Sequence, residues 1–393
     1  MTPPAGATVG ESRNGGIDAL RGIAILLVVL HHLALRIPLR DTALADWLPR
    51  RVLEGLSYNG YEAVFVFFVV SGYLIALYSL RRWGSLAAID LRGFYVRRLA
   101  RIMPSLLLLL AVLCAMHLAG VPGYVVDGPG QSLAGALLSA LGFHLNWYEG
   151  RTTWLPGNWD VLWSLSIEEV FYLGFPLVGL LLRRRTPLVL LLLALAVSVP
   201  WTRAALDGNE IWQEKAYLPG MSAIASGVLV ALAVARWQAP ARTARLLCLA
   251  GGLGLLAVVL CGRELWSSLG NGYMLVLTGS ASMLVAGLHC RHAAMPVPGT
   301  RATAWLRSWG RLSYEIYLSH MFVVFGLLAA YESRGGDVRQ GAWWYLPLLL
   351  LCWLLGLAFA RLWSEPCERR LRARLLAAPR PVMAASPNRA GNA

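Results

Sequence analysis

Arg21 and His32, whose side chains bind anions and transfer protons, lie in one apolar segment near the N-terminus. Eleven positions at about 100° per residue place them within roughly 20° of one helix face, about 16 Å apart along the axis. Asp18 lies on the same stripe. We therefore predict a helix face that joins an anion-binding cation, Arg21, to a catalytic base, His32.

A structural interpretation of this pair is also open. His32 could hydrogen-bond a neighbouring helix while Arg21 extends to a membrane interface. However, a charge at the centre of a bilayer costs roughly 2.5 to 3.5 kcal/mol on insertion scales, which favours a functional reason for its presence. The adjacent His31 points about 100° away from His32 and is the weaker catalytic candidate.

Two neighbouring carboxylates, Glu168 and Glu169, lie within the apolar segment that begins at Trp163. Adjacent helical residues face about 100° apart, so these two side chains do not form a tight pair on one face. We expect one to line a cavity, where it could orient a histidine or an acceptor hydroxyl, and the other to pair with an arginine. Glu168 is the predicted catalytic carboxylate. A purely structural ion pair is the alternative for either one.

Arg97, Arg98 and Arg101 form a basic entry to a further apolar helix. Guanidinium groups bind phosphates through paired hydrogen bonds, and a coenzyme A thioester offers several phosphates. These arginines could therefore bind the phosphates of a nucleotide-bearing ligand such as an acyl donor of this kind. It is equally open that they only set the orientation of the chain and contact anionic lipid headgroups.

Small and polar residues in two other apolar segments complete the candidate cavity. Ser71 and Gly72 form a small pair among bulky residues, so close helix packing is the first interpretation of Ser71. Near residue 315, Ser313, Tyr317 and His320 fall close to one stripe, with Glu315 elsewhere. A second histidine, His320, strengthens the case for a polar cavity that includes Ser71, Glu169 and Tyr317.

The composition requires a membrane to position these residues. The 393 residues are 57% hydrophobic and 14% charged, which is too apolar for a soluble domain of this size. The net charge of +14 is arranged in short clusters between apolar runs, which indicates membrane topology rather than nucleic-acid binding. Lys215 is the only lysine, which we attribute to genome composition. Six scattered cysteines indicate neither disulfides nor a metal site.

Ten apolar runs are long enough to be membrane helices, so we predict an all-α integral membrane bundle. They cover residues 17–36, 62–80, 102–120, 163–182, 186–201, 217–235, 245–262, 272–290, 313–331 and 343–363. An eleventh stretch, 131–147, is shorter and more polar. If it does not span, every strongly basic loop falls on one side, and both termini are cytoplasmic.

We therefore interpret 131–147 as re-entrant or interfacial. The predicted organisation is a disordered cytoplasmic tail (1–15), a transmembrane domain (16–365), and a cytoplasmic tail that is first basic and then disordered (366–393). A retained first helix is favoured over a signal peptide, because many further spans follow it.

Five short sequence motifs, in this order along the chain, closely resemble those of the acyltransferase 3 family of bacterial membrane acyltransferases. The resemblance covers about residues 15–365. The family motif Arg-x10-His falls on Arg21 and His32. The other matched strings are Phe67–Gly72, Arg98 with Arg101, Trp163–Glu169, and Ser313–His320. The proline common two places after the last string is Phe322 here, which affects a helix kink more than the chemistry.

The resemblance implies an acyltransferase that acylates cell-surface or exported carbohydrates such as exopolysaccharide, O-antigen or a glycoside. A cytoplasmic acyl-CoA, most commonly acetyl-CoA, would be the co-substrate, with no permanently bound cofactor. His32 would be catalytic and the Arg-x-x-Arg loop would serve the donor. The membrane domain would complete transfer alone, or pass the acyl group to a separate periplasmic protein. The expected location is the bacterial inner membrane.

Two routes stay open: His32 deprotonates the acceptor hydroxyl, or it carries the acyl group transiently. A glycolipid transporter or flippase is the rival from another class, since intramembrane Arg, His and Glu could form a substrate path. A different membrane-bound O-acyltransferase fold would also use an intramembrane histidine, but would not explain the Arg21 and His32 spacing.

Overall fold

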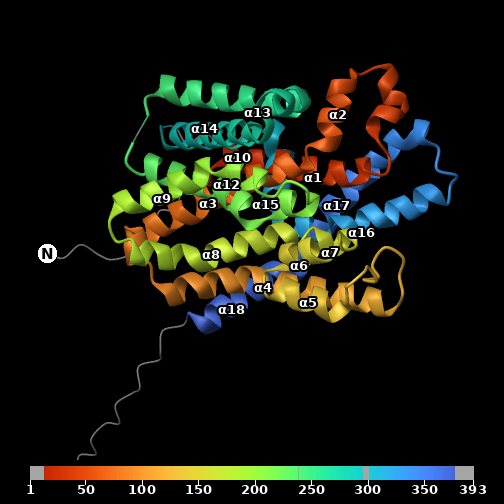
Figure 1. The fold of residues 1–393 in the computed structure, drawn as a ribbon, viewed down its shortest axis with the longest axis horizontal. Coiled ribbons are helices and arrows are strands. Elements are labelled where there is room, and N and C mark those ends of the chain that lie inside the picture. Colours follow the sequence, from red (N-terminus) through yellow and green to blue (C-terminus); the bar gives the residue numbers. More distant parts are fainter. Residues whose placement is uncertain (1–12, 238, 295–300, 377–393) are drawn as a thin grey trace, which may run out of the picture.

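Helices make up the whole regular structure of the part of the chain that the computed structural model describes, which is residues 13–237, 239–294 and 301–376 (Figure 1). Eight helical segments are long and apolar enough to cross a membrane. The all-α membrane fold predicted from hydropathy is therefore confirmed. Most of the predicted N-terminal tail and the end of the C-terminal tail lie outside the described residues.

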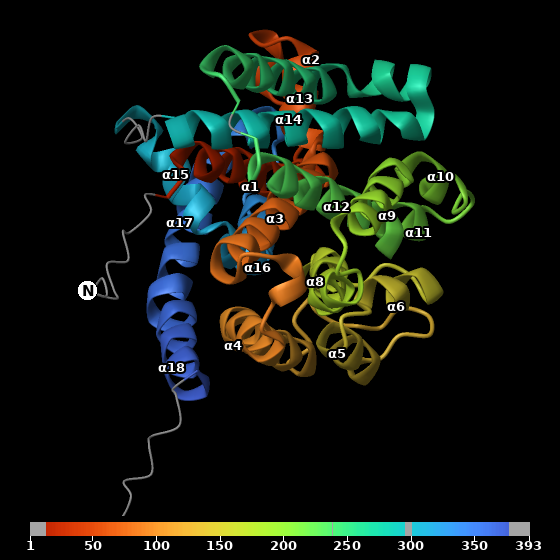
Figure 2. The same cartoon turned by 90° about the vertical axis from the view of Figure 1, so that its left-hand side faces the viewer.

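Every predicted apolar run contains at least one helix. The helices are α1 (Gly15–Ala34), α3 (Gly60–Trp83), α4 (Leu91–Leu118), α8 (Trp163–Leu181), α9 (Arg185–Val197), α12 (Tyr217–Val234), α13 (Ala241–Leu269), α14 (Tyr273–Ala294), α16 (Ser313–Glu332) and α17 (Tyr345–Phe359). One of the eight long segments, Ala241–Ala294, contains both α13 and α14, which pack side by side (Figure 2).

The predicted run 186–201 is divided into two helices. α9 ends at Val197, and Pro200 lies at the start of the short helix α10 (Val199–Ala204). Proline fits the first turn of a helix but has no N–H to continue an existing one, which explains the break. At 1.5 Å per residue, the 13 residues of α9 reach about 20 Å, which is less than the thickness of a bilayer core.

The remaining described α-helices are short, and most of them connect the long ones. They are α2 (Arg50–Tyr58), α5 (Leu133–Leu141), α6 (Leu145–Arg151), α7 (Gly157–Asp160), α11 (Glu210–Lys215), α15 (Ala304–Arg311) and α18 (Glu365–Leu375). The stretch 131–147 forms α5 and the start of α6, which have nine and seven residues. Neither helix is long enough to cross a bilayer, which agrees with a segment that does not span.

The basic entry predicted before the third span is itself helical, which corrects the expectation of an Arg-x-x-Arg loop. α4 begins at Leu91 because the Asp90 side chain accepts a hydrogen bond from the Gly93 N–H and caps the helix. Arg97, Arg98 and Arg101 therefore lie on two turns of one rigid helix. The sequence contained the cap, but the apolar run alone starts only at Ile102.

The small pair in α3 permits the close approach of α12. A Cβ at Gly72 would overlap the backbone carbonyl oxygen of Ile224, and a Cβ at Gly227 would overlap that of Val69. Two helices can approach this closely only where neither has a side chain at the crossing point. The packing interpretation of this string thus holds for Gly72, and Ser71 is left to face elsewhere.

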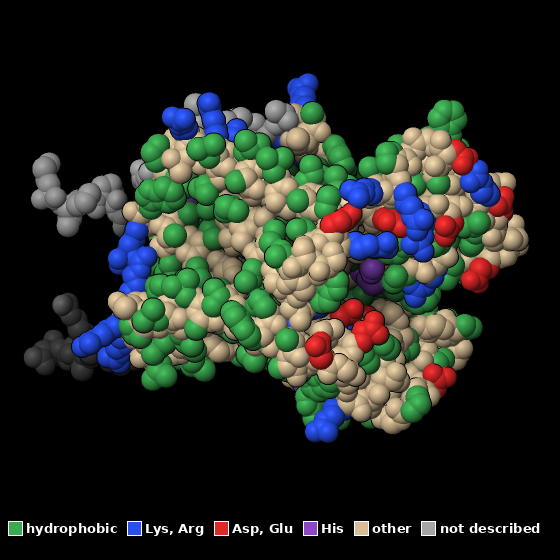
Figure 3. Space-filling model, turned by 45° about the horizontal axis from the view of Figure 1, so that its top comes forward, with side chains coloured by type: hydrophobic (Ala, Val, Ile, Leu, Met, Phe, Trp, Pro, Cys, Tyr) green, Lys and Arg blue, Asp and Glu red, His purple; other side chains and the backbone are tan. Residues whose placement is uncertain are grey.

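Charged side chains collect at the two ends of the bundle. On the face shown in Figure 3, one end carries only Lys and Arg, while the Asp and Glu side chains gather toward the opposite end with further basic residues. This asymmetry matches the division of loops on which the predicted topology rests. The helices between the two ends expose mainly apolar side chains, as expected for a lipid-facing surface.

Candidate active site

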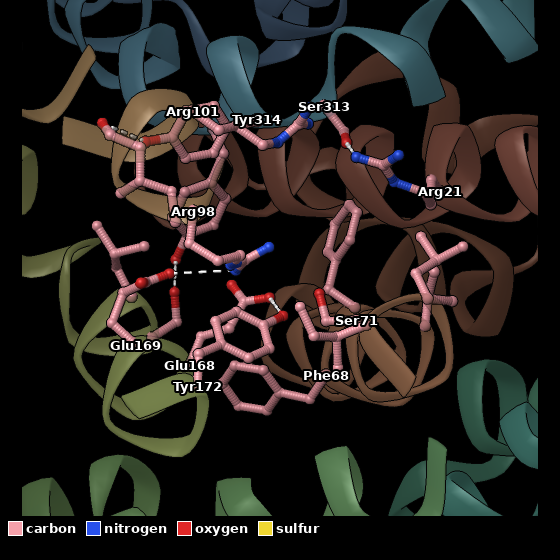
Figure 4. A pocket seen from close by; sticks show the side chains of 18 of the residues that line it. Arg21, Phe68, Ser71, Arg98, Arg101, Glu168, Glu169, Tyr172, Ser313 and Tyr314 are labelled. Carbon is pink, nitrogen blue, oxygen red and sulfur yellow. Dashed lines mark hydrogen bonds and ion pairs between the residues drawn. The ribbon is translucent and has the colours of Figure 1, made fainter. Parts of the chain in front are cut away.

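A cavity of about 360 Å³ lies between α3, α4, α8 and α16 (Figure 4). It gathers residues from distant parts of the chain. The predicted site residues that line it are Arg21, Ser71, Arg97, Arg98, Arg101, Glu168, Glu169 and Tyr317. His32 and His320 are not among the lining residues, but they lie beside Tyr317, as described below.

The cavity wall is strongly basic. Six arginines line it, Arg13, Arg21, Arg97, Arg98, Arg101 and Arg372, against two glutamates. Arg21 donates a 2.7 Å hydrogen bond to Ser313 Oγ, which holds the guanidinium of α1 against α16. The Nε atoms of Arg97 and Arg98 are buried without a hydrogen-bond partner among the described residues. Such a wall can bind a polyanionic ligand.

The two adjacent carboxylates have different partners, as their helical spacing predicts. Glu169 Oε1 lies 3.3 Å from Arg98 Nη2, and the Arg98 guanidinium stacks 3.7 Å from the centroid of the Tyr172 ring. Glu168 Oε1 accepts a 2.6 Å hydrogen bond from Tyr172 Oη. Both carboxylates line the cavity, so the pairing of Glu169 does not remove it from the site (Figure 4).

Tyr317 forms the boundary between the arginine-lined cavity and a pair of histidines. Its hydroxyl donates to the Val161 carbonyl at 2.8 Å and shares a 2.7 Å hydrogen bond with Ser164 Oγ. The Tyr317 and His320 ring centroids are 5.9 Å apart. Tyr317 and His320 are neighbours on α16, so this helix links the cavity wall to His320.

His320 is fully buried and has one unused ring nitrogen. Nδ1 lies 2.8 Å from the Tyr317 carbonyl oxygen, so this nitrogen carries a proton and donates it. Nε2 is buried without a hydrogen-bond partner among the described residues. The His320 ring centroid lies 5.0 Å from that of His32, which is partly exposed. The two histidines thus adjoin each other at the end of the site opposite the arginines of α4.

A profile of the acyltransferase 3 family, described as an acyltransferase domain, matches residues 14–361. This chain belongs to that family. It is similar to the O-acetyltransferase OatA of Staphylococcus aureus strain NCTC 8325 / PS 47, with 31% identity over 174 residues, which are 42% of this chain and 24% of that protein. OatA of strain COL gives the same values.

The match therefore covers about a quarter of the length of these relatives. No solved structure matches the chain. Within this acyltransferase 3 domain, the histidine that precedes His32 has a backbone partner: His31 Nδ1 lies 3.0 Å from the Ser57 carbonyl oxygen. This contact agrees with the structural role expected for His31.

One polar cluster of the acyltransferase 3 domain was not predicted as part of the site. Lys215 is only 2% exposed, and its Nζ lies 2.9 Å from Glu149 Oε2 and also pairs with Asp160. Its ammonium lies 4.0 Å from the centroid of the Trp154 ring. The signal in the sequence was the single lysine of an otherwise arginine-rich chain, which we assigned to genome composition.

This cluster, Lys215 with Glu149 and Asp160, holds the short helices α6, α7 and α11 together beside the histidine pair. Asp160 precedes Val161, whose carbonyl accepts the Tyr317 hydrogen bond. Arg36 donates a 3.1 Å hydrogen bond to the His32 carbonyl. Arg36 thus places a positive charge next to the end of α1 that carries His32.

Proposed function

We propose that this protein is an O-acyltransferase that moves an acyl group, acetyl in the simplest case, from acyl-CoA to a carbohydrate hydroxyl. Family membership supports acyl transfer. The single observation that carries the assignment of roles is the arginine-lined cavity that ends at Tyr317, with His320 and His32 beyond it. The acceptor would be a cell-surface or exported carbohydrate.

Donor binding is assigned to the basic end of the cavity. Arg97, Arg98 and Arg101 project from α4 at the end of the bundle where basic residues predominate, which the positive-inside rule assigns to the cytoplasm. The phosphates of acyl-CoA would bind these guanidinium groups, and the acyl thioester would extend toward Tyr317. Arg21, held by Ser313, would bind donor charge deeper in the site.

Catalysis is assigned to His32, by one of two routes. In direct transfer, His32 takes the proton of the acceptor hydroxyl, the oxygen forms a bond to the thioester carbonyl carbon, and the C–S bond breaks to release CoA thiolate. The thiolate then takes up the proton. In covalent transfer, a ring nitrogen of His32 forms a bond to the acyl carbon as the C–S bond breaks and CoA thiolate leaves. The acceptor oxygen then displaces the histidine from the acyl group, and the acceptor proton passes through the released imidazole to the thiolate.

The remaining predicted residues are assigned to positioning. Glu168, oriented by its hydrogen bond from Tyr172, would orient the reacting groups within the cavity. Ser71, Glu169, Tyr317 and His320 would shape the path between donor and acceptor. His32 is partly exposed, so an acceptor could reach it from the side opposite the basic end.

The experiment compares ester-linked acyl groups on the surface polysaccharide of wild-type, deletion and His32→Ala cells, by proton NMR before and after mild alkali. Loss of an ester signal in both the deletion and His32→Ala cells is expected. His144→Ala is the matched control, because the His144 ring packs against Trp147, with centroids 6.3 Å apart, whereas the His32 ring packs against His320. An ester signal that persists in His32→Ala cells but disappears on deletion would contradict the role of His32.

A further inference from the structure

A second cavity, of about 510 Å³, lies on the other side of α3 from the candidate active site. Its walls come from the C-terminal ends of α3, α8 and α12, the start of α9, and α14. The charged or titratable residues that line it are Arg81, Arg183, Arg185, Arg236 and His289. No Asp or Glu is among the described residues of its lining, so the cavity favours an anion.

Two of these arginines are available to a ligand. Arg183 and Arg236 are exposed, and within the described part of the chain neither forms an ion pair. Arg185 is half-buried and donates a 2.9 Å hydrogen bond to the Leu232 carbonyl, which fixes one wall. Guanidinium groups in such an arrangement bind phosphate oxygens through paired hydrogen bonds.

The apolar part of the lining indicates where that phosphate comes from. Six leucines, Leu77, Leu80, Leu86, Leu182, Leu188 and Leu232, share the cavity with the arginines. Further leucines of α8 and α9 are exposed on the faces turned away from this lining, namely Leu173, Leu177 and Leu181 on α8 and Leu190, Leu191 and Leu193 on α9. A phosphate seated among the arginines would thus have the apolar surface of the lining beside it for acyl chains.

We propose that this cavity binds the phosphate headgroup of an anionic phospholipid from the leaflet at the basic end of the bundle. The headgroup phosphate contacts Arg183 and Arg236, and the lipid chains lie along the leucines of the cavity lining. The site is separate from the donor cavity, so the proposal does not depend on acyl transfer. A soluble phosphate compound shares the headgroup chemistry but has no acyl chains to contact the leucines.

The test measures phosphatidylglycerol bound to the purified full chain by native mass spectrometry, in parallel with phosphatidylcholine. The variant is Arg183→Gln/Arg236→Gln. At about 1 kcal/mol per arginine, phosphatidylglycerol affinity should fall about 30-fold. The matched control is Arg242→Gln/Arg245→Gln, which removes two exposed charges from the start of α13, outside the cavity. The control should bind phosphatidylglycerol as the wild type does.

Two results would overturn the proposal. An equal loss of phosphatidylglycerol in both double variants would mean that surface charge alone attracts the lipid. Displacement of bound phosphatidylglycerol by adenosine 3′,5′-bisphosphate would assign the cavity to a soluble phosphate ligand. Neither measurement uses acyl transfer, so failure here is distinguishable from failure of the proposed enzymatic function.

Discussion

At the scale of single residues, the arginines of α4 can be separated by what they contact. Arg98 already has Glu169 and Tyr172 as partners, while Arg97 and Arg101 line the cavity without an ion pair among the described residues. Binding of the donor phosphates should therefore depend most on Arg97 and Arg101, and Arg98 should also stabilise the fold.

Replacing both Arg97 and Arg101 with Gln should raise the KM for acyl-CoA at least about 10-fold, because two charge-assisted contacts to phosphate are lost. The kcat should change less, because His32 is untouched. Steady-state kinetics with acetyl-CoA checks this expectation. Arg311→Gln, which removes an exposed charge from the same end of the bundle, is the control. A KM equal to that of wild type would contradict a role of the α4 arginines in donor binding.

The buried lysine gives a prediction about stability. Lys215→Met leaves Glu149 and Asp160 facing each other without the ammonium between them. Removing one partner of a buried ion pair costs about 3–5 kcal/mol. Thermal unfolding in detergent should show a large fall in Tm. Arg51→Met is the control, because the Arg51–Glu264 pair is exposed and such pairs contribute about 0–1 kcal/mol. A similar Tm for both variants would contradict the role of the cluster.

Glu149 should also make stability depend on pH. Burial, together with the charge of Asp160, raises the pKa of the Glu149 carboxyl, although Lys215 opposes this. The folded state then binds this proton more tightly than the unfolded state does. That stabilisation is complete below the ordinary glutamate pKa of about 4.3 and is lost as pH rises through the higher folded-state pKa.

Glu149→Gln should therefore flatten the fall in Tm as the pH rises from acidic to neutral. Glu54→Gln is the control: the guanidinium of Arg50 lowers the pKa of the Glu54 carboxyl, so its contribution has the opposite sign and grows as pH rises. If Tm fell with rising pH as steeply in Glu149→Gln as in the wild type, Glu149 would not be the group responsible.

At the scale of elements, helix contacts are set by glycine more than by hydropathy. Gly72→Ala should destabilise the protein by about 1–3 kcal/mol, because its Cβ would overlap the Ile224 carbonyl of α12. Gly174→Ala in α8 is the matched control, since a Cβ there meets no atom within 4 Å. Unfolding in denaturant would compare the two. Equal stability of both variants would show that α3 and α12 can separate without cost.

Hydropathy predicted the helices well because a helix that crosses a bilayer needs a long run of apolar side chains. It failed where local chemistry determines a helix end. Asp90 starts α4 eleven residues before its apolar run, and Pro200 divides 186–201 into two helices. Both signals were present as single residues, but a window average of hydropathy does not register them.

The sequence likewise predicted only part of the candidate site. Regular helical spacing was enough to place Arg21 and His32 on one face, and Glu168 and Glu169 toward different partners. It was not enough to find the ion pairs of Lys215, because these depend on how α6, α7 and α11 pack against one another. Such contacts between short helices have no periodic signature in the sequence.

At the scale of the whole molecule, the two cavities and the charge asymmetry imply one orientation in the membrane. The turn after Leu182 should face the cytoplasm, and the turn after Glu332 should face the opposite side. Arg184→Cys and Ser333→Cys, each in a background without the native cysteines, should react with a membrane-impermeant thiol reagent from opposite sides. Labelling of both from the same side would contradict the proposed topology.

The central claim is that acyl groups cross from a cytoplasmic acyl-CoA to an acceptor through His32. The most direct test supplies labelled acetyl-CoA, which does not cross membranes, to inverted and right-side-out membrane vesicles that contain the acceptor. We predict alkali-labile label in the polysaccharide of inverted wild-type vesicles, and none in right-side-out vesicles or in inverted His32→Ala vesicles. Equal labelling in both orientations, or full labelling with His32→Ala, would contradict the account.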